Sequence, residues 1–364
     1  MMKALKEYLG QIRDPRINRR KLHLLEDIVL LVLIAVICGC ESWETIEEFG
    51  KNKIGFLKKY LKLTNGIPSH DTIERLFKRM DNIVFSDVLM QWSNLLRKKG
   101  VGDIVSVDGK TLCGSKDTAN GRYAIHLVSA WCNKNRLVLG QVKTACKTNE
   151  IDAVKELLKL LDIEGAVITA DAMSCQKEIV KQIVEQKADY IIAVKDNQKT
   201  LREDIAYEFK TQSGIDMHQS IEKDHGRIET RRCQVINNLK ELAGRGNWTA
   251  LKSIVKITSV RDINGVQSQE ERLYISSKLQ TAEYFNKAVR THWGIENSLH
   301  WRIDVQFNED KSRKRKDNAA ENFATVRRLA LTKLTNTPFK RQGVYNRRLI
   351  ASWNQDYLTE VLKN

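Results

Sequence analysis

Three acidic residues, far apart in the chain, stand where a carboxylate can hold a metal ion. Asp108 follows the β-like run Ile104–Val107 and precedes Gly109, which gives room for a close backbone approach. Asp171 ends the apolar run AVITA, and Glu296 lies in HWGIENSLHW, whose pattern predicts a helix. Three carboxylates suit Mg²⁺ or Mn²⁺, and two such ions about 4 Å apart stabilise the attacking and leaving oxygens of phosphoryl transfer.

Each of these acids also has an ordinary structural interpretation. An aspartate at the end of a strand often caps a turn, and a glutamate on a helix is most often exposed. His292 and His300 flank Glu296 and suggest zinc, but no compact set of Cys and His residues accompanies them. The metal interpretation therefore depends on whether the fold brings the acids together.

The middle of the chain predicts a mixed α/β layer. Three β-rich runs, DIVSVD, YAIHLVSAW and RLVLGQVKT, come first, with turn residues between the last two. The amphipathic helix NEIDAVKELLKLLD, the strand GAVITAD, the helix QKEIVKQIVEQK and the strand ADYIIAV follow. Short connections predict an antiparallel meander for the first three strands. With the first and fourth strands as neighbours, Asp108 and Asp171 would lie at corresponding ends of adjacent strands.

The flanking segments differ in character, and five regions are expected. They are a helical domain over 1–95 that grips DNA ends or serves as a compact cap, a first catalytic part over 96–211, a β-rich insertion over 212–280, completing helices over 281–335, and a tail over 336–364. Asn264-Gly265 predicts a hairpin turn inside the insertion. On the helix that carries Glu296, we expect Trp293, Leu299 and Ile303 to face the core, so that Glu296 points toward the two aspartates.

Bulk composition favours a polyanionic partner in a reducing compartment. Lys and Arg outnumber Asp and Glu by 61 to 45, for a net charge of +16, and each phosphate that a basic side chain neutralises releases counterions. Seven cysteines without a C-x-x-C pair argue against a disulfide framework. The apolar run Ile28–Cys38 is too short for a membrane span and predicts a buried helix. We expect a cytoplasmic protein without an export signal or a membrane partner.

With these residues in view, the chain resembles the DDE transposases of bacterial insertion sequences, in the branch of the H-repeat-associated proteins. The resemblance covers nearly the whole chain. It is carried by DPRINRRKLHLLEDI, ESWETIEEFG, NGIPSHDTIERLF, VSVDGKTLCGS, HLVSAW, LGQVKTACKTNEI, ITADAMSCQKEIV, DYIIAVKDNQ, HGRIETRR, RTHWGIENSLHWRIDVQFNED and AAENFATVRRLAL. One position departs from the pattern, because Cys113 stands where an arginine is expected.

The resemblance implies a ribonuclease H-like catalytic core with a β-rich insertion before the last acid. It carries the catalytic and metal-binding roles onto Asp108, Asp171 and Glu296, with two Mg²⁺ or Mn²⁺ ions in the active complex. It implies cleavage at the element's inverted-repeat ends, attack of the freed 3′-hydroxyl on double-stranded target DNA, and a dimer when two ends are paired.

Polar residues near the acids and in basic runs are candidate DNA contacts. They are Lys110, Lys195, Asn197, Gln198, Arg290, His292 and Arg302 near the acids, Arg227 and Arg231 in HGRIETRR, and Arg313, Lys314 and Arg315 in KSRKRK. His292 occupies the offset of a family arginine before the glutamate, and Arg302 lies one residue short of a second basic position. Helix-surface salt bridges, pairing with Glu229 and a solvated charge run are the alternatives.

Two other functions remain open from the sequence. A decayed or repurposed copy would bind DNA ends without catalysis, and a metal-dependent nuclease would cut without preference for inverted repeats.

Overall fold

The structure is a computed structural model, and it describes residues 2–17, 21–144, 150–224, 226–339 and 342–363. In chain order its main elements are α1 (Met2–Leu9), α2 (Leu25–Ile37), α3 (Trp43–Asn52), α4 (Ile54–Leu57), α5 (His70–Arg79), α6 (Asn82–Leu96), β1 (Ile104–Leu112), β2 (Ile125–Cys132), β3 (Leu137–Thr144), α7 (Glu150–Leu160), β4 (Val167–Ala170), α8 (Lys177–Glu185), β5 (Asp189–Val194), α9 (Lys199–Thr211), β6 (Asp216–Asp224), β7 (Arg227–Ile236), β8 (Ser253–Ile263), β9 (Val266–Ser276), α10 (Ala282–His292), α11 (Trp301–Phe307), α12 (Ala319–Asn336), α13 (Val344–Trp353) and α14 (Gln355–Lys363). The mixed α/β class predicted from the sequence is confirmed.

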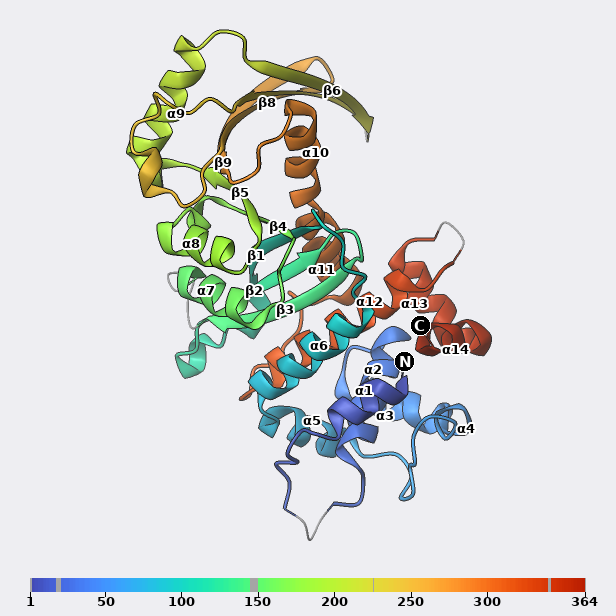
Figure 1. Cartoon of the computed structure of the whole chain (residues 1–364). Helices are drawn as coiled ribbons and strands as arrows, with labels where there is room; N and C mark the ends of the chain where they lie inside the picture. Colours follow the sequence, from blue (N-terminus) through green and yellow to red (C-terminus); the bar gives the residue numbers. More distant parts are fainter. Residues whose placement is uncertain (1, 18–20, 145–149, 225, 340–341, 364) are drawn as a thin grey trace.

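One nine-stranded sheet runs through the molecule in the order β3-β2-β1-β4-β5-β9-β8-β7-β6 (Figure 1). β1, β2 and β3 form the predicted antiparallel meander. β1 and β4 are neighbours, as expected, and pair in parallel with Val107 opposite Ala170. Each of these two residues directly precedes one of the candidate aspartates, so the register brings Asp108 and Asp171 to the same level of adjacent strands.

The β-rich segment after α9 extends this sheet, because β9 pairs antiparallel with β5. The predicted hairpin is confirmed: β8 and β9 pair around Asn264 and Gly265, whose φ angles of 52° and 83° suit a tight two-residue turn. β6 was not expected as a strand. Its sequence, DMHQSIEKD, carries few apolar residues, and it forms the edge of the sheet, where such a strand needs little apolar cover.

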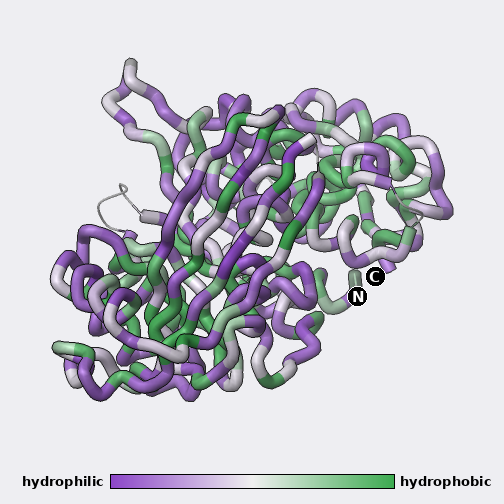
Figure 2. Tube along the Cα trace, turned by 90° about the horizontal axis from the view of Figure 1, so that it is seen from above, coloured by the Kyte–Doolittle hydropathy of each residue, from purple (hydrophilic) through white to green (hydrophobic). Residues whose placement is uncertain are grey.

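Helices cover the two faces of the sheet with separate apolar cores. On one face α7, α8 and α9 bury residues such as Leu157, Ile179 and Ile205. On the other face α10 buries Phe285 and Val289 against β7, β8 and the central strands. Figure 2 views the molecule from above and shows the strands running side by side. α10 therefore lies on the face opposite to α7 and α8, and its C-terminal end carries the chain back to the centre of the sheet.

The helices that precede the sheet share a core with those at the end of the chain (Figure 1). α2 is buried along nearly its whole length, which confirms the predicted buried helix. α12 packs against α2, α5 and α6, and every residue from Ala319 to Leu334 is buried. Within this layer Trp43 contacts Phe77 and Phe323, with ring centroids 5.2 Å apart in each pair.

Two further sequence expectations bear on this layer. Among the described residues, no helix combines the length and apolar character that crossing a membrane requires. The cysteines at positions 38, 40, 113, 132, 175 and 233 are unpaired thiols, and Cys146 lies outside the described residues.

Candidate functional site

β1 presents Asp108 from the middle of the strand, whereas Asp171 follows the end of β4, so the two acids do not both lie at strand ends. One carboxylate oxygen, Oδ1, accepts the backbone N–H of Gly109 at 2.9 Å. The space beside Gly109 is taken by side chains and not by a backbone: a Cβ there would lie 2.4 Å from Nε2 of His126 and 2.7 Å from Oε1 of Glu150. Glycine at 109 therefore lets a buried polar pair pack directly behind the aspartate.

Glu296 reaches the same place from the face of the sheet that α10 covers. α10 ends at His292, and residues 296–300 form a π-helical turn in which the N–H of Trp301 bonds to the carbonyl of Glu296. Ligand atoms of Asp108, Glu296 and His300 all lie within 4.8 Å of one another. His300 Nδ1 is 3.2 Å from Glu296 Oε2 and 3.5 Å from Asp108 Oδ2.

Asp171 lies directly after β4 and is not a member of that three-residue group. Its side chain accepts the N–H of Met173 at 3.0 Å and so caps the short turn Ala172–Ser174. It is nevertheless close enough for its charge to raise the pKa of Asp108. The structure thus joins Asp108 and Glu296 directly, and it relates Asp171 to them through strand register and charge.

Burial dominates the electrostatics of the two aspartates. It raises the pKa of Asp108 to about 6, and His300 opposes the shift. Burial also raises the pKa of Asp171, and the charge of Glu150 adds to this. The pKa of Glu296 is lowered, chiefly by its hydrogen bond with His300. Carboxylates whose ionised form is disfavoured by burial and by one another gain from a cation among them.

His300, Glu150 and His126 were missed as site residues by the sequence reasoning. His300 is 3% exposed and lies four residues after Glu296, a spacing that places two side chains on one helical face and was available from the sequence. His126 Nε2 lies 2.9 Å from Glu150 Oε2, and its Nδ1 lies 3.0 Å from Oγ1 of Thr111. No local sequence signal indicated this buried pair, because its members lie on different elements.

A groove of about 220 Å³ lined by arginines borders Glu296. It lies between α10 and the strands β7, β8 and β9. Its arginines are Arg227, Arg231, Arg261, Arg272 and Arg290.

Two carboxylates partly neutralise the charge of these arginines. Glu222 bonds Arg231 at 2.6 Å and Arg290 at 2.8 Å, and buried Glu229 lies between Arg231 and Arg261. Nε of Arg231 and Nε of Arg261 are buried without a hydrogen-bond partner among the described residues. Three candidate DNA contacts, Arg227, Arg231 and Arg290, therefore lie in this groove, and His225 lies outside the described residues.

Four other candidate DNA contacts stand next to the acids, and three of them hold neighbouring protein groups. Lys110, 9% exposed at its side chain, pairs with Asp304 at 2.6 Å and Asp310 at 3.6 Å. Asn197 donates to the carbonyl of Ala172, and Gln198 donates to that of Cys175. These two amides therefore shape the turn that follows Asp171. Lys195 lies close enough to lower the pKa of Asp171.

His292, Trp293 and Arg302 are placed by the helices around Glu296. His292 bonds Oγ1 of Thr169 at 2.9 Å, and burial lowers the pKa of His292 to about 4, so its ring is neutral at neutral pH. The prediction that Trp293 faces the core is wrong: it is 36% exposed, with the guanidinium of Arg272 stacked 4.6 Å from its ring centre. Leu299 and Ile303 are fully buried, as predicted. Arg302 is partly buried on α11, and burial lowers its pKa.

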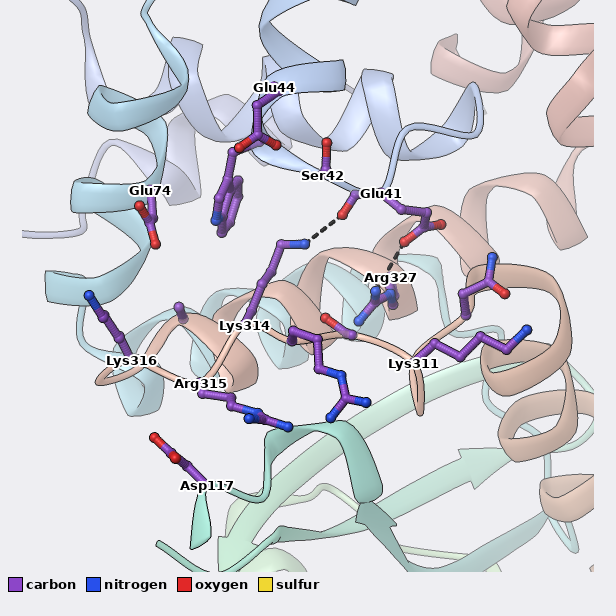
Figure 3. A pocket seen from close by; sticks show the side chains of 15 residues that line it. Glu41, Ser42, Glu44, Glu74, Asp117, Lys311, Lys314, Arg315, Lys316 and Arg327 are labelled. Carbon is purple, nitrogen blue, oxygen red and sulfur yellow. Dashed lines mark hydrogen bonds and ion pairs between the residues drawn. The ribbon is translucent and has the colours of Figure 1, made fainter. Parts of the chain in front are cut away.

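The basic run KSRKRK lines a cavity of about 620 Å³ between the sheet and the N-terminal helices (Figure 3). Lys314 points to the N-terminal layer, donates to the carbonyl of Glu41 at 2.5 Å, and lies 4.0 Å from the centre of the Phe323 ring. Burial lowers the pKa of Lys314 to about 8. Arg315 donates to the carbonyl of Gly114 at 3.0 Å. Lys314 and Arg315 thus hold the segment against the protein. Of the three candidates in this run, only Arg313 is exposed and has no partner among the described residues.

Cys113, which replaces the expected arginine, is exposed beside this region. Its backbone N–H donates to Asp310 Oδ1 at 3.3 Å. Since Asp310 also lies near Lys110, a longer basic side chain at position 113 would stand close to the acidic residues that hold Lys110.

The sequence comparisons agree with the geometry. Residues 99–333 match the family described as "Transposase DDE domain", and residues 6–93 match its associated N-terminal family, "DDE_Tnp_1-associated". The chain is 41% identical to "Putative transposase YncI" of Escherichia coli O157:H7, over 99% of this chain and 95% of that protein. It is 40% identical to "H repeat-associated putative transposase YhhI" of Escherichia coli K12, over 99% and 98% of the two chains. A shorter match, 47% identical over 21% of this chain, is to "Inactive transposase YbfQ" of the same strain. By sequence the chain therefore belongs to the DDE transposase family, among its H-repeat-associated members.

Proposed function

We propose that this protein cuts DNA at the ends of an insertion sequence and joins the freed ends to target DNA, with Asp108, Asp171 and Glu296 as its metal-binding acids. The observation that carries the proposal is the meeting of Asp108, on β1, with Glu296, which follows the β-rich segment by way of α10. Nothing in local structure requires these two carboxylates to converge. Their convergence beside the end of β4, in a chain of this family, is what a phosphoryl-transfer site needs.

The donor set fits hard divalent cations. Asp108 offers Oδ2, because Oδ1 is engaged by the N–H of Gly109, and Glu296 offers a side chain that is 53% exposed and free to adjust. Asp171 supplies a further carboxylate from the neighbouring strand. Mg²⁺ and Mn²⁺ prefer such oxygen ligands. When bound, two such ions would stabilise charge on the attacking and leaving oxygens of the phosphodiester.

The surrounding residues position the DNA in this proposal. The arginine groove borders Glu296, and guanidinium groups that line it can donate to phosphate oxygens. Arg227, which is exposed and has no described partner, extends the groove at the surface. We assign phosphate contacts to Arg227 and to Arg290, whose side chain is 40% exposed, and we leave out Arg231 and Lys314, which are buried against protein partners.

We further assign β1–β5 and their covering helices to a ribonuclease H-like core, with β6–β9 as its insertion. The boundaries remain those expected from the sequence, with a catalytic domain over 96–211 and 281–335. The helices over 1–95 are proposed to bind the element's ends, and pairing of two ends makes the active complex a dimer.

The test uses a supercoiled plasmid that carries the reading frame with its native flanking DNA. Full-length protein is incubated with this plasmid and Mg²⁺ or Mn²⁺, and cleavage positions are mapped by primer extension. We expect metal-dependent cuts at the element ends. Asp108→Ala should bind the same DNA without cutting, whereas Asp87→Asn, which changes an exposed acid on α6, should cut like the wild type.

Two alternative functions predict different results. A DNA-binding protein without catalysis would bind the ends, with the wild type as inactive as Asp108→Ala. The match to a relative named as inactive, together with Cys113, gives this alternative its specific support. A nuclease of another role would cut without preference for the ends. Either result would refute the proposed function.

A further inference from the structure

His300 stands at the centre of the acidic site. The sequence suggested it only as a zinc ligand beside His292, and the family's three acids do not include it. The ring is 3% exposed and comes from the last residue of the π-helical turn. Its Nδ1 faces both carboxylates, 3.2 Å from Glu296 Oε2 and 3.5 Å from Asp108 Oδ2. A buried imidazole is thus aimed at the oxygens that are proposed to hold a cation.

We propose that His300 is the third protein ligand of the cation held by Asp108 and Glu296, and that its nitrogen makes this site favour Mn²⁺ over Mg²⁺. The inference rests on the proposed function, because it concerns the same metal site. It goes further by naming a nitrogen ligand and a metal preference.

The spacing of the three atoms fits a shared ion. An octahedral ion with ligands at about 2.1 Å places neighbouring ligand atoms about 3.0 Å apart. The two distances from Nδ1 exceed this value by only a few tenths of an ångström, and all three ligand atoms lie within 4.8 Å of one another. The Glu296 side chain is half exposed and free to adjust, whereas the histidine is fixed by burial. A small rotation of the carboxylate therefore completes the site.

The local backbone is built to hold this arrangement. Residues 296–300 form a single π turn rather than a continuation of α10 or α11. Such turns interrupt α-helices mostly as isolated insertions and are frequent at functional sites. In this turn the side chain of Glu296 is half exposed and that of His300 is buried, and both are directed at Asp108.

Coordination of a cation by His300 needs the lone pair of Nδ1. Nε2 of His300 is buried and has no hydrogen-bond partner among the described residues. Histidines that bind metals usually have a partner on the second nitrogen that fixes the tautomer. In the metal-free site Nδ1 makes the hydrogen bond to Glu296 Oε2. A bound cation would take the place of this hydrogen bond, with the ring proton on Nε2 and the lone pair of Nδ1 on the ion. Imidazole nitrogen is a better ligand for Mn²⁺ and other transition ions than for Mg²⁺, which sets the direction of the preference.

The experiment reads the ligand atom directly. Full-length protein is loaded with Mn²⁺, and electron spin-echo modulation is recorded to detect ¹⁴N coupled to the bound ion. Mn²⁺ affinity is measured by titration of the free-ion EPR signal, and Mg²⁺ affinity by competition. The variants are His300→Ala and His300→Asn, which replaces the nitrogen ligand with an amide oxygen. The control is His70→Asn, at a half-exposed histidine on α5.

We expect a directly coordinated ¹⁴N signal in the wild type and in His70→Asn, and its loss in both His300 variants. Mn²⁺ affinity should fall about tenfold or more in His300→Ala. In His300→Asn the ratio of Mn²⁺ to Mg²⁺ affinity should fall, because an oxygen donor no longer favours the transition ion. Circular dichroism of the metal-free variants shows whether they fold, and His300→Asn keeps the test decisive if His300→Ala does not.

Three other outcomes would overturn these claims. A wild type that binds Mn²⁺ through Asp108 but shows no coordinated nitrogen would refute the histidine ligand and leave the carboxylate site standing. Mn²⁺ binding that is unaffected by Asp108→Ala would instead refute the metal site of the proposed function. A nitrogen signal that persists in His300→Asn would also overturn the inference, since another residue would then supply it.

Discussion

Substituting Gly109 with alanine tests how tightly the protein is packed behind Asp108. The new Cβ would lie 2.4 Å from His126 Nε2 and 2.7 Å from Glu150 Oε1, both of which are too close for an ordinary contact. His126 is 3% exposed and Glu150 is 5% exposed, so neither side chain has open solvent into which it can move. The clash should therefore break the hydrogen bond between them, which is 2.9 Å long.

The expected cost follows from two contributions. Overpacking a close-packed site costs about 1–3 kcal/mol, and losing a hydrogen bond to a charged group costs about 1.5–3 kcal/mol. Because partial movement of the pair relieves some of the clash, we expect Gly109→Ala to lower the free energy of unfolding by about 2–4 kcal/mol. Asp108 should shift too, since its Oδ1 accepts the N–H of Gly109.

Urea unfolding followed by tryptophan fluorescence measures this cost, and Mn²⁺ titration measures the displacement of Asp108. The control is Gly246→Ala, whose Cβ meets no atom within 4 Å and should change stability by less than about 0.5 kcal/mol. In a His126→Ala background, the added cost of Gly109→Ala should fall by at least about 1 kcal/mol, because the nearest clashing atom is gone. A cost below about 1 kcal/mol, or full additivity of the two substitutions, would refute the reasoning.

Three further predictions concern charges. Burial raises the pKa of Asp108 to about 6. The contribution of this group to the free energy of unfolding is therefore fully present below its unfolded pKa near 3.8 and is lost as pH rises through 6. In metal-free buffer Asp108→Asn should be about 1–3 kcal/mol more stable than the wild type near neutral pH, the difference should shrink toward about pH 4, and equal thermal midpoints at neutral pH would contradict this. Arg328 and Glu309 form a 3.0 Å ion pair with side-chain exposures of 0% and 1%. Arg328→Met should lower the free energy of chemical unfolding by about 3–5 kcal/mol, and adding Glu309→Leu should recover most of this loss. A small loss in the single variant would show that the pair is not isolated from water. Arg227→Ala should lower the salt-dependence slope of DNA binding by about one, whereas Lys314→Met should leave it unchanged. The opposite pattern would place the DNA at the cavity lined by residues 311–316 and not at the arginine groove.

The central part of the fold could be predicted because its signals are local. A few neighbouring residues are enough to predict these elements: the apolar runs predict β1, β4 and β5, the amphipathic pattern predicts α7 and α8, and Asn264-Gly265 predicts the hairpin turn. β6 was missed because a polar edge strand buries little and so has no apolar pattern. Trp293 was assigned to the core by helical spacing, but the π turn and a stacked arginine keep it at the surface.

The family and the three candidate acids were within reach of the sequence, because many ordered motifs and the apolar runs that lead into the two aspartates are properties of the linear chain. Which groups share the site was decided by tertiary structure. His300 lies between Asp108 and Glu296, and Glu150 packs with His126 behind Gly109, only because β1, β2, the start of α7 and the turn after α10 converge at one point of the sheet. Likewise, Lys314 looks like a free cation in the sequence, but the fold places it against two aromatic rings and a carbonyl. Charge and residue type are fixed along the chain, whereas burial and partners depend on contacts between distant segments, and those contacts determine whether a basic side chain is available to a phosphate.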